Sequence, residues 1–518
     1  MYKFLKIIFL VIVFATTSCN NAVEQKSTSK KMNILFLAMD DLKPMLGAYG
    51  DDYIISPNID KLASEGVVFD NAYAQQAVCA VSRVSLFCGQ RPDRTKVWDL
   101  KTKMRKVKPN ALTIPQYFKE NGYITVGRGK LIHGAKDNDP ISWTIPYIYP
   151  DRMKYAEGFS APAQDRYQNP KIQALMKEAK SKKLSWRETN VLFRSKGLAL
   201  STECMDIPDN AYVDGATADA GIEFLDEFSK SDKPFFLALG FKKPHLPFVA
   251  PKKYWDMYNR EDMKVAPFQK HAKDSPELAY KLWGEIRGYS DIVKEGPIPY
   301  EKQKELIHGY HACVSYVDAQ VGRVLNHLKK LGLDKNTLIV LWGDHGWHLG
   351  DHGLWTKHSN FEQATRVPLI ISAPDFKKGV HAKTMSELVD IFPTLVDYAG
   401  LKMPENLEGK SLMPVMNDVN IEVKDFAISQ FQRGENDDIM GYSLRTDRYR
   451  LTVWLRGNYR KEAIYVNPVF EAVELYDYVN DPLEKVSLAK NLDYKTLTDS
   501  LTTKLITELR KQKKNYGY

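Results

Sequence analysis

Short apolar runs alternate with helically spaced apolar residues along most of the chain. Residues 33–39 form a continuous apolar run, which is typical of a strand buried on both faces. Residues 57–65 have apolar positions at helical spacing, and Gly66 follows as a helix stop. The alternation predicts an α/β fold with a mostly parallel sheet and helices on both faces. Similar signals predict strands at 67–69, 123–126, 234–239, 337–342 and 368–372, and helices at 113–120, 210–228 and 301–331.

The pattern changes after about residue 417. Apolar and polar residues then alternate as in an antiparallel sheet. We therefore expect a large domain over 32–417 and a smaller α+β domain with an antiparallel sheet over 418–518. The signals in the smaller domain are a hairpin over 440–454, a strand over 473–478 and a helix over 494–511.

Two segments of the large domain, 142–200 and 256–300, are rich in Pro, Lys and Tyr and lack a regular pattern. They are expected to be loop insertions. Such loops often carry substrate specificity because a rigid scaffold positions them while their sequence is free to vary.

The first residues have the pattern of an export signal. Lys3 and Lys6 precede an apolar run over 7–14, and small residues lead to Cys19. A membrane-spanning helix needs roughly twenty apolar residues, so this run is too short to be one. Cys19 resembles the lipidated cysteine at a bacterial lipoprotein cleavage site, and a bystander cysteine after an ordinary signal is the alternative.

The segments that follow from this interpretation are a signal peptide over 1–18 and a polar, flexible tether over 19–31. The expected location is the cell envelope, as a periplasmic or outer-membrane-associated lipoprotein. The lipid anchor would be the only membrane contact.

Composition narrows the class of protein. The chain has 518 residues, of which 44% are hydrophobic and 26% are charged, so it is too apolar for a disordered protein. The formal net charge of +9 comes from dispersed Lys and Arg without a basic aromatic motif, which argues against a nucleic-acid partner. Five cysteines are too few for a disulfide scaffold of this size.

Polar residues follow three of the predicted strands. Asp40 and Asp41 come directly after the first strand, His245 follows another, and Asp344 and His345 follow a third. Ligands of open α/β sheets bind at the carboxyl ends of the strands. We therefore expect these side chains to meet at one edge of the sheet.

The adjacent carboxylates Asp40 and Asp41 favour a hard cation such as calcium or magnesium, which prefers oxygen ligands. The run of His345, His348 and His352 leaves zinc as the alternative.

Cys79 is a candidate nucleophile. It stands in Cys79-Ala-Val-Ser-Arg83, just before a helix expected to start near Ser82. A helix N-terminus and the cation of Arg83 both favour negative charge on a thiol. A buried structural cysteine is the alternative.

Blocks of sequence spaced along residues 32–490 resemble the sulfatase family, and its iduronate-2-sulfatase-like members in particular. The match is weakest in the two insertions. The blocks that carry the resemblance are Met39-Asp-Asp-Leu-Lys-Pro44, Ser56-Pro-Asn-Ile-Asp60, Gln75-Gln-Ala-Val-Cys79, Ser82-Arg-Val-Ser85, Arg91-Pro-Asp93, Gly129-Lys-Leu-Ile-His133, Lys243-Pro-His-Leu-Pro-Phe248, Gly343-Asp-His-Gly-Trp-His-Leu-Gly350, Trp355-Thr-Lys-His-Ser-Asn-Phe361, Met440-Gly-Tyr-Ser-Leu-Arg445 and Glu474-Leu-Tyr476.

The resemblance implies an alkaline-phosphatase-like fold, one calcium ion and a covalent mechanism. It implies that a formylglycine-generating enzyme oxidises Cys79 to the aldehyde formylglycine. One hydroxyl of the hydrated aldehyde would attack the sulfur of a sulfate ester, and the other would later release sulfate.

The resemblance also assigns roles to individual residues. Calcium would be held by Asp40, Asp41, Asp344 and His345 together with residue 79. The sulfate oxygens would be held by Arg83, Lys130 and Lys357. His133 would contact the second hydroxyl, and His245 would protonate the leaving alcohol.

Two positions depart from the family pattern that the modifying enzyme reads. Position 81 is Val where the family usually has Pro, and position 88 is Cys where Thr or Ser is common.

The resemblance favours sulfated glycans as substrates, either uronate-containing polymers such as heparan or dermatan sulfate or algal ulvan. His245, Trp98 and the insertions are candidates for contacts with the sugar, and for Trp98 simple packing is an alternative at least as good. A phosphoester or phosphonate hydrolase of the same fold and a non-catalytic glycan-binding lipoprotein remain as alternatives.

Overall fold

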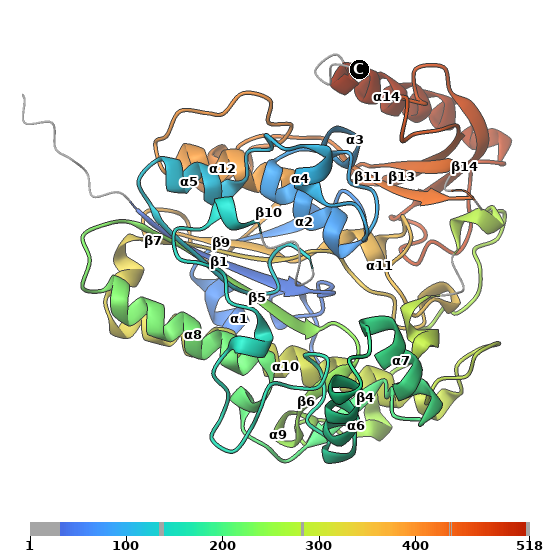
Figure 1. Ribbon diagram of the computed structural model, residues 1–518. Coiled ribbons are helices and arrows are strands. Elements are labelled where there is room, and N and C mark those ends of the chain that lie inside the picture. Colours follow the sequence, from blue (N-terminus) through green and yellow to red (C-terminus); the bar gives the residue numbers. More distant parts are fainter. Residues whose placement is uncertain (1–31, 134–138, 281–283, 435, 437, 514–518) are drawn as a thin grey trace, which may run out of the picture. The chain divides into compact units, whose positions relative to one another are not determined.

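The central sheet has eight strands and confirms the predicted α/β class (Figure 1). In the computed structural model the described residues are 32–133, 139–280, 284–434, 436 and 438–513, and the expected signal peptide, tether and Cys19 lie outside them. The strand order is β10 (Val380–Glu387), β2 (Val67–Tyr73), β9 (Leu369–Ser372), β7 (Thr337–Gly343), β1 (Asn33–Asp40), β5 (Phe235–Pro244) and β3 (Ile124–Gly129), with β8 (Arg366–Val367) paired to β2.

Strand direction follows the prediction except at β9 and at the two-residue β8, which is antiparallel to β2. β1 is parallel to β5 and β7, β3 is parallel to β5, and β2 is parallel to β10. β9 runs antiparallel to both β7 and β2. The chain between β7 and β8 stays at the carboxyl edge of the sheet, where Gly346 N–H donates to the carbonyl of Ala364 at 2.8 Å. The next strands therefore start from that edge and run back.

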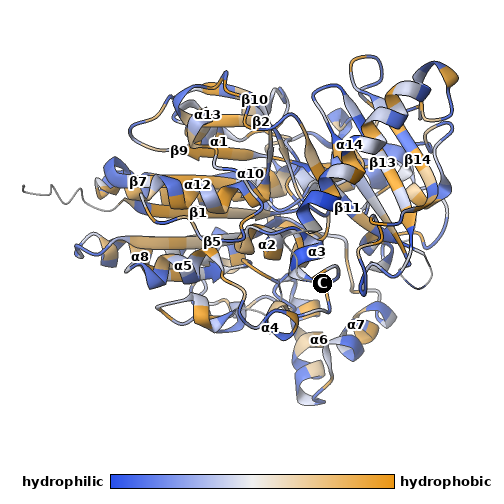
Figure 2. Ribbon diagram, turned by 90° about the horizontal axis from the view of Figure 1, so that it is seen from above, coloured by the Kyte–Doolittle hydropathy of each residue, from blue (hydrophilic) through white to orange (hydrophobic). Residues whose placement is uncertain are grey.

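Alternate side chains of β1 enter two different cores. Leu35 and Leu37 pack on one face of the sheet, and Ile34 and Phe36 pack on the other. Helices cover both faces, so the central strands are apolar throughout (Figures 1 and 2). The first face carries α1 (Pro57–Ser64), α8 (Val213–Phe228) and α10 (Tyr300–Lys330), and the second carries α2 (Cys79–Cys88), α5 (Ile114–Glu120) and α12 (Ile391–Tyr398).

A second sheet follows residue 417 and is antiparallel, as predicted. Its strands pair in chain order, and α14 packs on it through a separate apolar cluster that includes Leu505 and Leu509. The domain boundary near residue 417 stays a prediction. The elements are β11 (Ala427–Arg433), β12 (Ile439–Arg445), β13 (Tyr449–Arg456), β14 (Val469–Asp477) and α14 (Lys495–Lys513).

The segment 142–200 is not simply a loop, which corrects the expectation. It contains α6 (Pro170–Ser181) and α7 (Trp186–Ser195). Asn169 caps α6, and Ser185 forms a capping box with Glu188 at the start of α7. These caps are visible in the sequence, but the high content of Lys and polar residues hid the apolar face of each helix.

The described residues of the segment 256–300 that precede α10 form short 3-10 turns at Arg260–Asp262, Glu277–Ala279 and Glu285–Gly288, in keeping with the irregular pattern. In the described part of the chain, no helix combines the length and apolar character needed to span a bilayer. The remaining short elements are α3 (Pro92–Thr95), α4 (Met104–Val107), α9 (Lys252–Trp255), α11 (Glu362–Thr365), α13 (Met413–Asn417), β4 (Thr202–Met205) and β6 (Phe248–Pro251).

Candidate active site

Two adjacent carboxylates emerge at the carboxyl end of β1. The pairing of β1 with β5 shifts register between Met39 and Asp40, and Asp41 has a left-handed backbone with φ of 63°. An aspartate tolerates this conformation better than most residues. The N–H of Asp41 donates to Oδ1 of Asp344 at 3.0 Å, which fixes the turn. The two strand ends therefore meet, as the sequence predicted.

Arg83 lies beneath these carboxylates and is fully buried. Its Nε donates to Oδ2 of Asp344 at 2.8 Å, and its Nη2 lies 3.3 Å from Oδ1 of Asp40. Its Nη1 donates to the carbonyl of Lys130 at 2.6 Å. Among the described residues that line the cavity above, Arg83 is absent. Its position suits holding the carboxylates in place rather than direct contact with sulfate.

Four groups converge above this base. Ligand atoms of Asp40, Asp41, Cys79 and His345 all lie within 4.8 Å of one another. His345 Nε2 is 3.3 Å from Sγ of Cys79 and 3.4 Å from Oδ1 of Asp41. Asp344 stands beside the group, with Oδ2 at 3.6 Å from the same nitrogen. The structure thus brings together all five residues expected at the metal.

The donor set fits a hard dication. Burial raises the pKa of Asp41, and repulsion from Asp40 and Asp344 raises it further against the opposing effect of Lys357. A divalent cation would relieve this repulsion. Burial also lowers the pKa of His345 to about 4, so its imidazole is neutral at pH 7.

The zinc alternative finds no cluster of its own. Within the described ranges, the group around Asp40 is the only one with three or more ligands close enough to share an ion. His348 Nε2 contacts the Ser359 hydroxyl at 2.9 Å, and His352 Nε2 contacts the carbonyl of Glu484 at 3.1 Å. The Nε2 atoms of both histidines are therefore engaged within the chain, away from the group around Asp40.

Two lysines face the carboxylates. Lys357 Nζ donates to Asp41 Oδ1 at 2.9 Å, and Lys130 pairs with Asp40. Burial alone raises the pKa of Asp40, but Lys130, His245 and Arg83 outweigh it and hold that pKa well below its ordinary value. Both lysines line the same cavity as Cys79, so they are placed to bind an anion there.

His245 lines the same cavity as Cys79. Its Nε2 lies 3.5 Å from Glu285 Oε1 and 3.8 Å from Asp41 Oδ2. Burial lowers the pKa of His245 well below its ordinary value, although Glu285 opposes the shift. His133 also lines the cavity, and burial lowers its pKa to about 3. Its Nδ1 is buried without a hydrogen-bond partner among the described residues.

Cys79 itself differs from the sequence expectation in two ways. It is the first residue of α2, so the helix begins three residues earlier than the expected Ser82. Burial raises the pKa of its thiol well above the ordinary value, and Asp40 raises it further. The raised pKa differs from the lowered one expected beside a helix N-terminus and Arg83, so the thiol is not poised to act as a thiolate.

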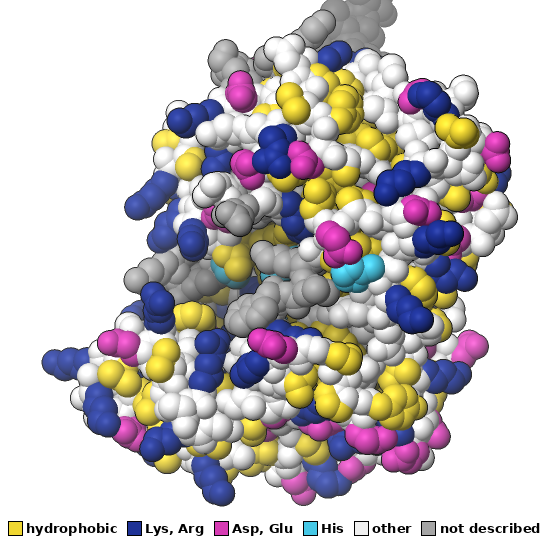
Figure 3. Space-filling model, turned by 90° about the vertical axis from the view of Figure 1, so that its right-hand side faces the viewer, with side chains coloured by type: hydrophobic (Ala, Val, Ile, Leu, Met, Phe, Trp, Pro, Cys, Tyr) yellow, Lys and Arg dark blue, Asp and Glu magenta, His cyan; other side chains and the backbone are white. Residues whose placement is uncertain are grey.

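A cavity of about 850 Å³ opens above Cys79. Lysine and arginine side chains border the hollow on the face seen in Figure 3. Trp98 does not line it: its ring is buried and its Nε1 donates to Asp93 at 2.9 Å, so of the two alternatives for Trp98 the structure favours packing over a sugar contact. The lining includes Cys79, Leu100, Lys130, His133, Trp143, Tyr147, Arg166, Trp186, Arg194, Lys242, His245, Glu285 and Lys357.

Sequence reasoning missed two carboxylates of the site. Glu285 Oε2 lies 3.4 Å from Lys357 Nζ, so this residue bridges Lys357 and His245. Asp214 accepts the backbone N–H groups of Lys242 and Lys243 at 2.8 Å each, which fixes the segment before His245. Asp214 is a buried acid in a predicted helix, a detectable signal, whereas Glu285 stands in an irregular segment without one.

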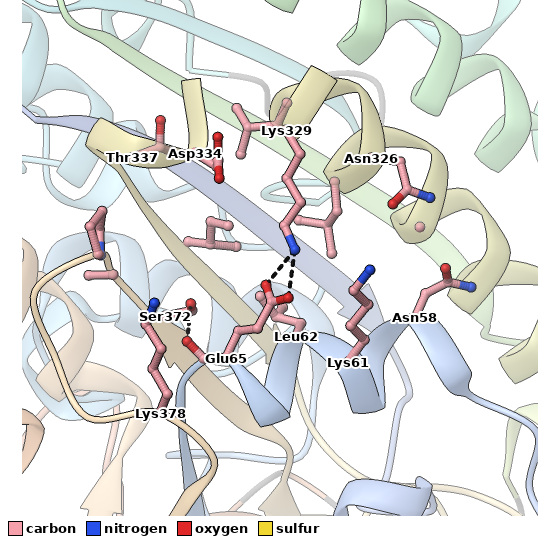
Figure 4. A pocket seen from close by; sticks show the side chains of 16 residues that line it. Asn58, Lys61, Leu62, Glu65, Asn326, Lys329, Asp334, Thr337, Ser372 and Lys378 are labelled. Carbon is pink, nitrogen blue, oxygen red and sulfur yellow. Dashed lines mark hydrogen bonds and ion pairs between the residues drawn. The ribbon is translucent and has the colours of Figure 1, made fainter. Parts of the chain in front are cut away.

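A second, smaller hollow of about 80 Å³ lies near the amino end of β7 (Figure 4). Thr337, the first residue of β7, is part of it, so the hollow is at the edge of the sheet opposite Asp344. Lys329 from α10 points to Glu65, and the two form an ion pair at 2.6 Å. This hollow contains no cluster of nucleophiles or metal ligands among the described residues that line it.

Comparison with known proteins decides the family. The model of the Sulfatase family matches residues 32–401. The chain belongs to the sulfatase family. A second model, N-sulphoglucosamine sulphohydrolase, C-terminal, matches residues 350–512 of this sulfatase. The prediction of a sulfuric ester hydrolase is thereby confirmed.

Curated relatives cover nearly the whole sulfatase. Iduronate 2-sulfatase of Mus musculus is 36% identical over 93% of this chain and 95% of its own. Iduronate 2-sulfatase of Homo sapiens is 34% identical over 92% of this chain and 94% of its own. A sulfatase of Formosa agariphila is 31% identical over 95% and 90%.

Solved structures share the fold. A protein in complex with its substrate D-glucosamine-2-N,6-O-disulfate matches with a TM-score of 0.69 and 21% identity, over 94% of this chain and 98% of its own. Phosphonate monoester hydrolase of Agrobacterium radiobacter matches with a TM-score of 0.68 and 24% identity, over 93% and 96%. At these identities the likeness concerns the fold alone, so it does not indicate whether the substrate is a sulfate ester or a phosphonate ester.

Proposed function

We propose that this sulfatase hydrolyses sulfate esters on a sulfated glycan, using a formylglycine made from Cys79 and one calcium ion. One observation carries the proposal. Cys79 lines the cavity, and its sulfur lies in one cluster with ligand atoms of Asp40, Asp41 and His345. The cations Lys130 and Lys357, which pair with these two carboxylates, line the same cavity. A group at this position contacts both a metal site and an anion site.

The proposed metal ligands are Asp40, Asp41, Asp344, His345 and the side chain at position 79. A bound calcium ion would supply positive charge that neutralises the sulfate and favours deprotonation of an attacking hydroxyl. Arg83 contributes by fixing the carboxylates of Asp40 and Asp344 from below. Holding these groups before substrate arrives avoids reorganisation during the reaction.

Formylglycine at position 79, as its hydrated aldehyde, would supply both the nucleophilic hydroxyl and the hydroxyl that releases sulfate. Lys130 and Lys357 bind the sulfate oxygens, and His133 receives a hydrogen bond from one hydroxyl. His245 donates the proton that the leaving alcohol needs. The neighbouring carboxylate of Glu285 supports the protonated form of His245 at that moment.

The proposed substrate is a uronate-containing glycan carrying a 2-O-sulfate, or an ulvan-like polymer. Relatives named iduronate 2-sulfatase and an ulvan-active sulfatase of Formosa agariphila support this choice. The size of the cavity supports it as well, because about 850 Å³ is far more than a sulfate group needs.

The decisive experiment is the mass of the peptide that contains Cys79, from protein made with a formylglycine-generating enzyme. The proposal expects the mass of an aldehyde, together with turnover of an aryl sulfate that exceeds turnover of the matched aryl phosphate and phosphonate. An intact thiol in fully active protein refutes the formylglycine. An aldehyde together with faster turnover of the aryl phosphonate than of the aryl sulfate supports the phosphonate-hydrolase alternative.

We also propose that the protein is exported and anchored to the cell envelope through a lipid on Cys19. The basic start, the short apolar run and the small residues before Cys19 support this. Metabolic labelling with a radioactive fatty acid tests it, since Cys19→Ala should abolish label and Cys204→Ala should retain it. Label that persists in Cys19→Ala would contradict the anchor.

A further inference from the structure

A tight turn in the 142–200 segment presents Arg166 to the cavity. Ala163 and Tyr167 pair as an antiparallel bridge, with N–H to carbonyl distances of 2.8 and 3.1 Å. Gln164 and Asp165, the first two of the three residues between them, have φ of 55° and 57°, which is the left-handed region. Non-glycine residues pay a conformational cost there, so the surrounding structure must hold the turn in place.

The turn is held from two sides. Lys242 Nζ, at the end of β5, lies 3.2 Å from Oδ2 of Asp165. Gln164 Nε2 donates to Oδ1 of Asn190 on α7 at 3.4 Å. Arg166 therefore has a defined position over the cavity, and the turn is linked to α7.

Helix α7 adds a second arginine. Trp186, Asn190 and Arg194 are spaced four residues apart, so they lie on one face of the helix. Trp186 and Arg194 both line the cavity. Arg194 reaches Gly288 of the 256–300 segment, since a Cβ at Gly288 would lie 3.0 Å from its Nη2. Trp186 remains 69% exposed at the same cavity.

These two arginines differ from the other cations of the cavity. Lys130 pairs with Asp40, Lys357 with Asp41 and Lys242 with Asp165, and Lys243 donates to the backbone carbonyls of residues 245 and 247. No described residue forms a side-chain hydrogen bond or ion pair with the guanidinium of Arg166 or Arg194.

Carboxylates do act on Arg166 from a distance. Asp165 and Glu285 affect it electrostatically, but neither forms an ion pair with it. A guanidinium is always charged and presents donors that match an oxyanion in a fork. Two such groups at one cavity, with their donors available, suit an anionic ligand.

We propose that Arg166 and Arg194 form a second oxyanion subsite, which binds a carboxylate or sulfate of the substrate other than the sulfate being cleaved. This inference rests on the proposed function and narrows it to substrates with at least two anionic groups. Trp186, on the same face of α7 as Arg194, supplies an apolar surface for the adjoining sugar ring.

The test compares kcat/KM on matched substrates. The first pair is a 2-O-sulfated uronate glycoside and its neutral analogue with a hydroxymethyl group in place of the carboxylate. The second pair is a disaccharide with and without an additional sulfate on the neighbouring sugar. The preference is the ratio of kcat/KM for the substrate with the additional anionic group to kcat/KM for its analogue without that group. The pair with the larger preference identifies whether a carboxylate or a second sulfate occupies the subsite.

The double variant Arg166→Gln, Arg194→Gln should reduce that preference at least ~10-fold, mainly through KM, because each charge-assisted hydrogen bond contributes substantially. Arg187→Gln is the matched control, since it removes the same charge from α7 outside the cavity lining. It should keep the preference. A preference that survives in the double variant overturns the subsite.

Binding separates this inference from the proposed chemistry. Cys79→Ala protein is titrated with the preferred glycan by calorimetry, with and without the two arginine substitutions. Loss of affinity on removal of both arginines supports the subsite even in a protein that proves inactive. Equal affinities with and without the arginines overturn it, whatever the turnover of the wild type.

Discussion

His345 Nε2 lies 3.3 Å from the sulfur of Cys79, although 266 positions separate the two residues in the chain. The contact joins the start of α2 to the turn that follows β7. It places the predicted nucleophile directly against a predicted metal ligand. The metal site and the reacting group therefore share one set of side chains, and a change at either affects both.

Calcium should stabilise the protein, because the ion relieves repulsion among Asp40, Asp41 and Asp344. At a concentration 100 times its Kd, a ligand of the native state adds about 2.7 kcal/mol to the free energy of unfolding. Magnesium should add less, because it demands tighter octahedral geometry. Thermal unfolding of chelator-treated protein with each ion measures this. Stronger stabilisation by zinc than by calcium would contradict the proposed metal.

Arg83→Lys should weaken both folding and calcium binding. Three guanidinium nitrogens of Arg83 each contact a different partner, and the single ammonium of a lysine cannot reproduce that fork. Disrupting a buried ion-pair network costs roughly 3–5 kcal/mol. The matched control is Arg91→Lys, which disturbs the buried pair with Glu387 away from the site. Both variants should unfold at lower temperature. Calcium titration should change only for Arg83→Lys, and an equal change in both would refute the positioning role.

His245→Gln should slow hydrolysis of sugar sulfates by ~10²–10⁴-fold, which is the usual contribution of a general acid. The rate of hydrolysis of aryl sulfates with an acidic phenol should fall less in this variant, because such a leaving group departs without a proton. The exposed His381, which pairs with Asp70, provides the control variant His381→Gln with full activity expected. Equal losses on both substrate types would exclude His245 as the proton donor.

Glu362 should make stability depend on pH. Burial raises the pKa of Glu362, but Arg445 and Arg450 from the second sheet outweigh it and lower the pKa to about 2. The lowered value means that the stabilisation is complete above the unfolded pKa of about 4.3 and is lost as the pH falls towards 2.

Glu362→Gln tests this relation by urea unfolding at pH 7 and pH 3. The variant should lose roughly 3–5 kcal/mol at pH 7, since one partner of a buried pair is removed. The difference from wild type should shrink at pH 3, where wild-type Glu362 begins to take up a proton. A difference independent of pH would show that Glu362 acts through packing rather than charge.

The sequence by itself determined the strands and the residues that follow them. Continuous apolar runs predicted β1, β5 and β7, because strands covered on both faces need apolar residues at every position. Since parallel strands end at a common edge, the order of residues alone was enough to group Asp40, His245 and Asp344. The ordered motifs also predicted the family.

Only the tertiary structure decided how these groups are used. Arg83 carries the same charge as Lys130 and Lys357 in the sequence, but burial under two carboxylates takes it out of the cavity. Glu285 and Arg166 come from irregular segments whose place depends on long-range packing, so no local pattern could position them. Distance and burial, which the order of residues does not encode locally, set the role of each charge.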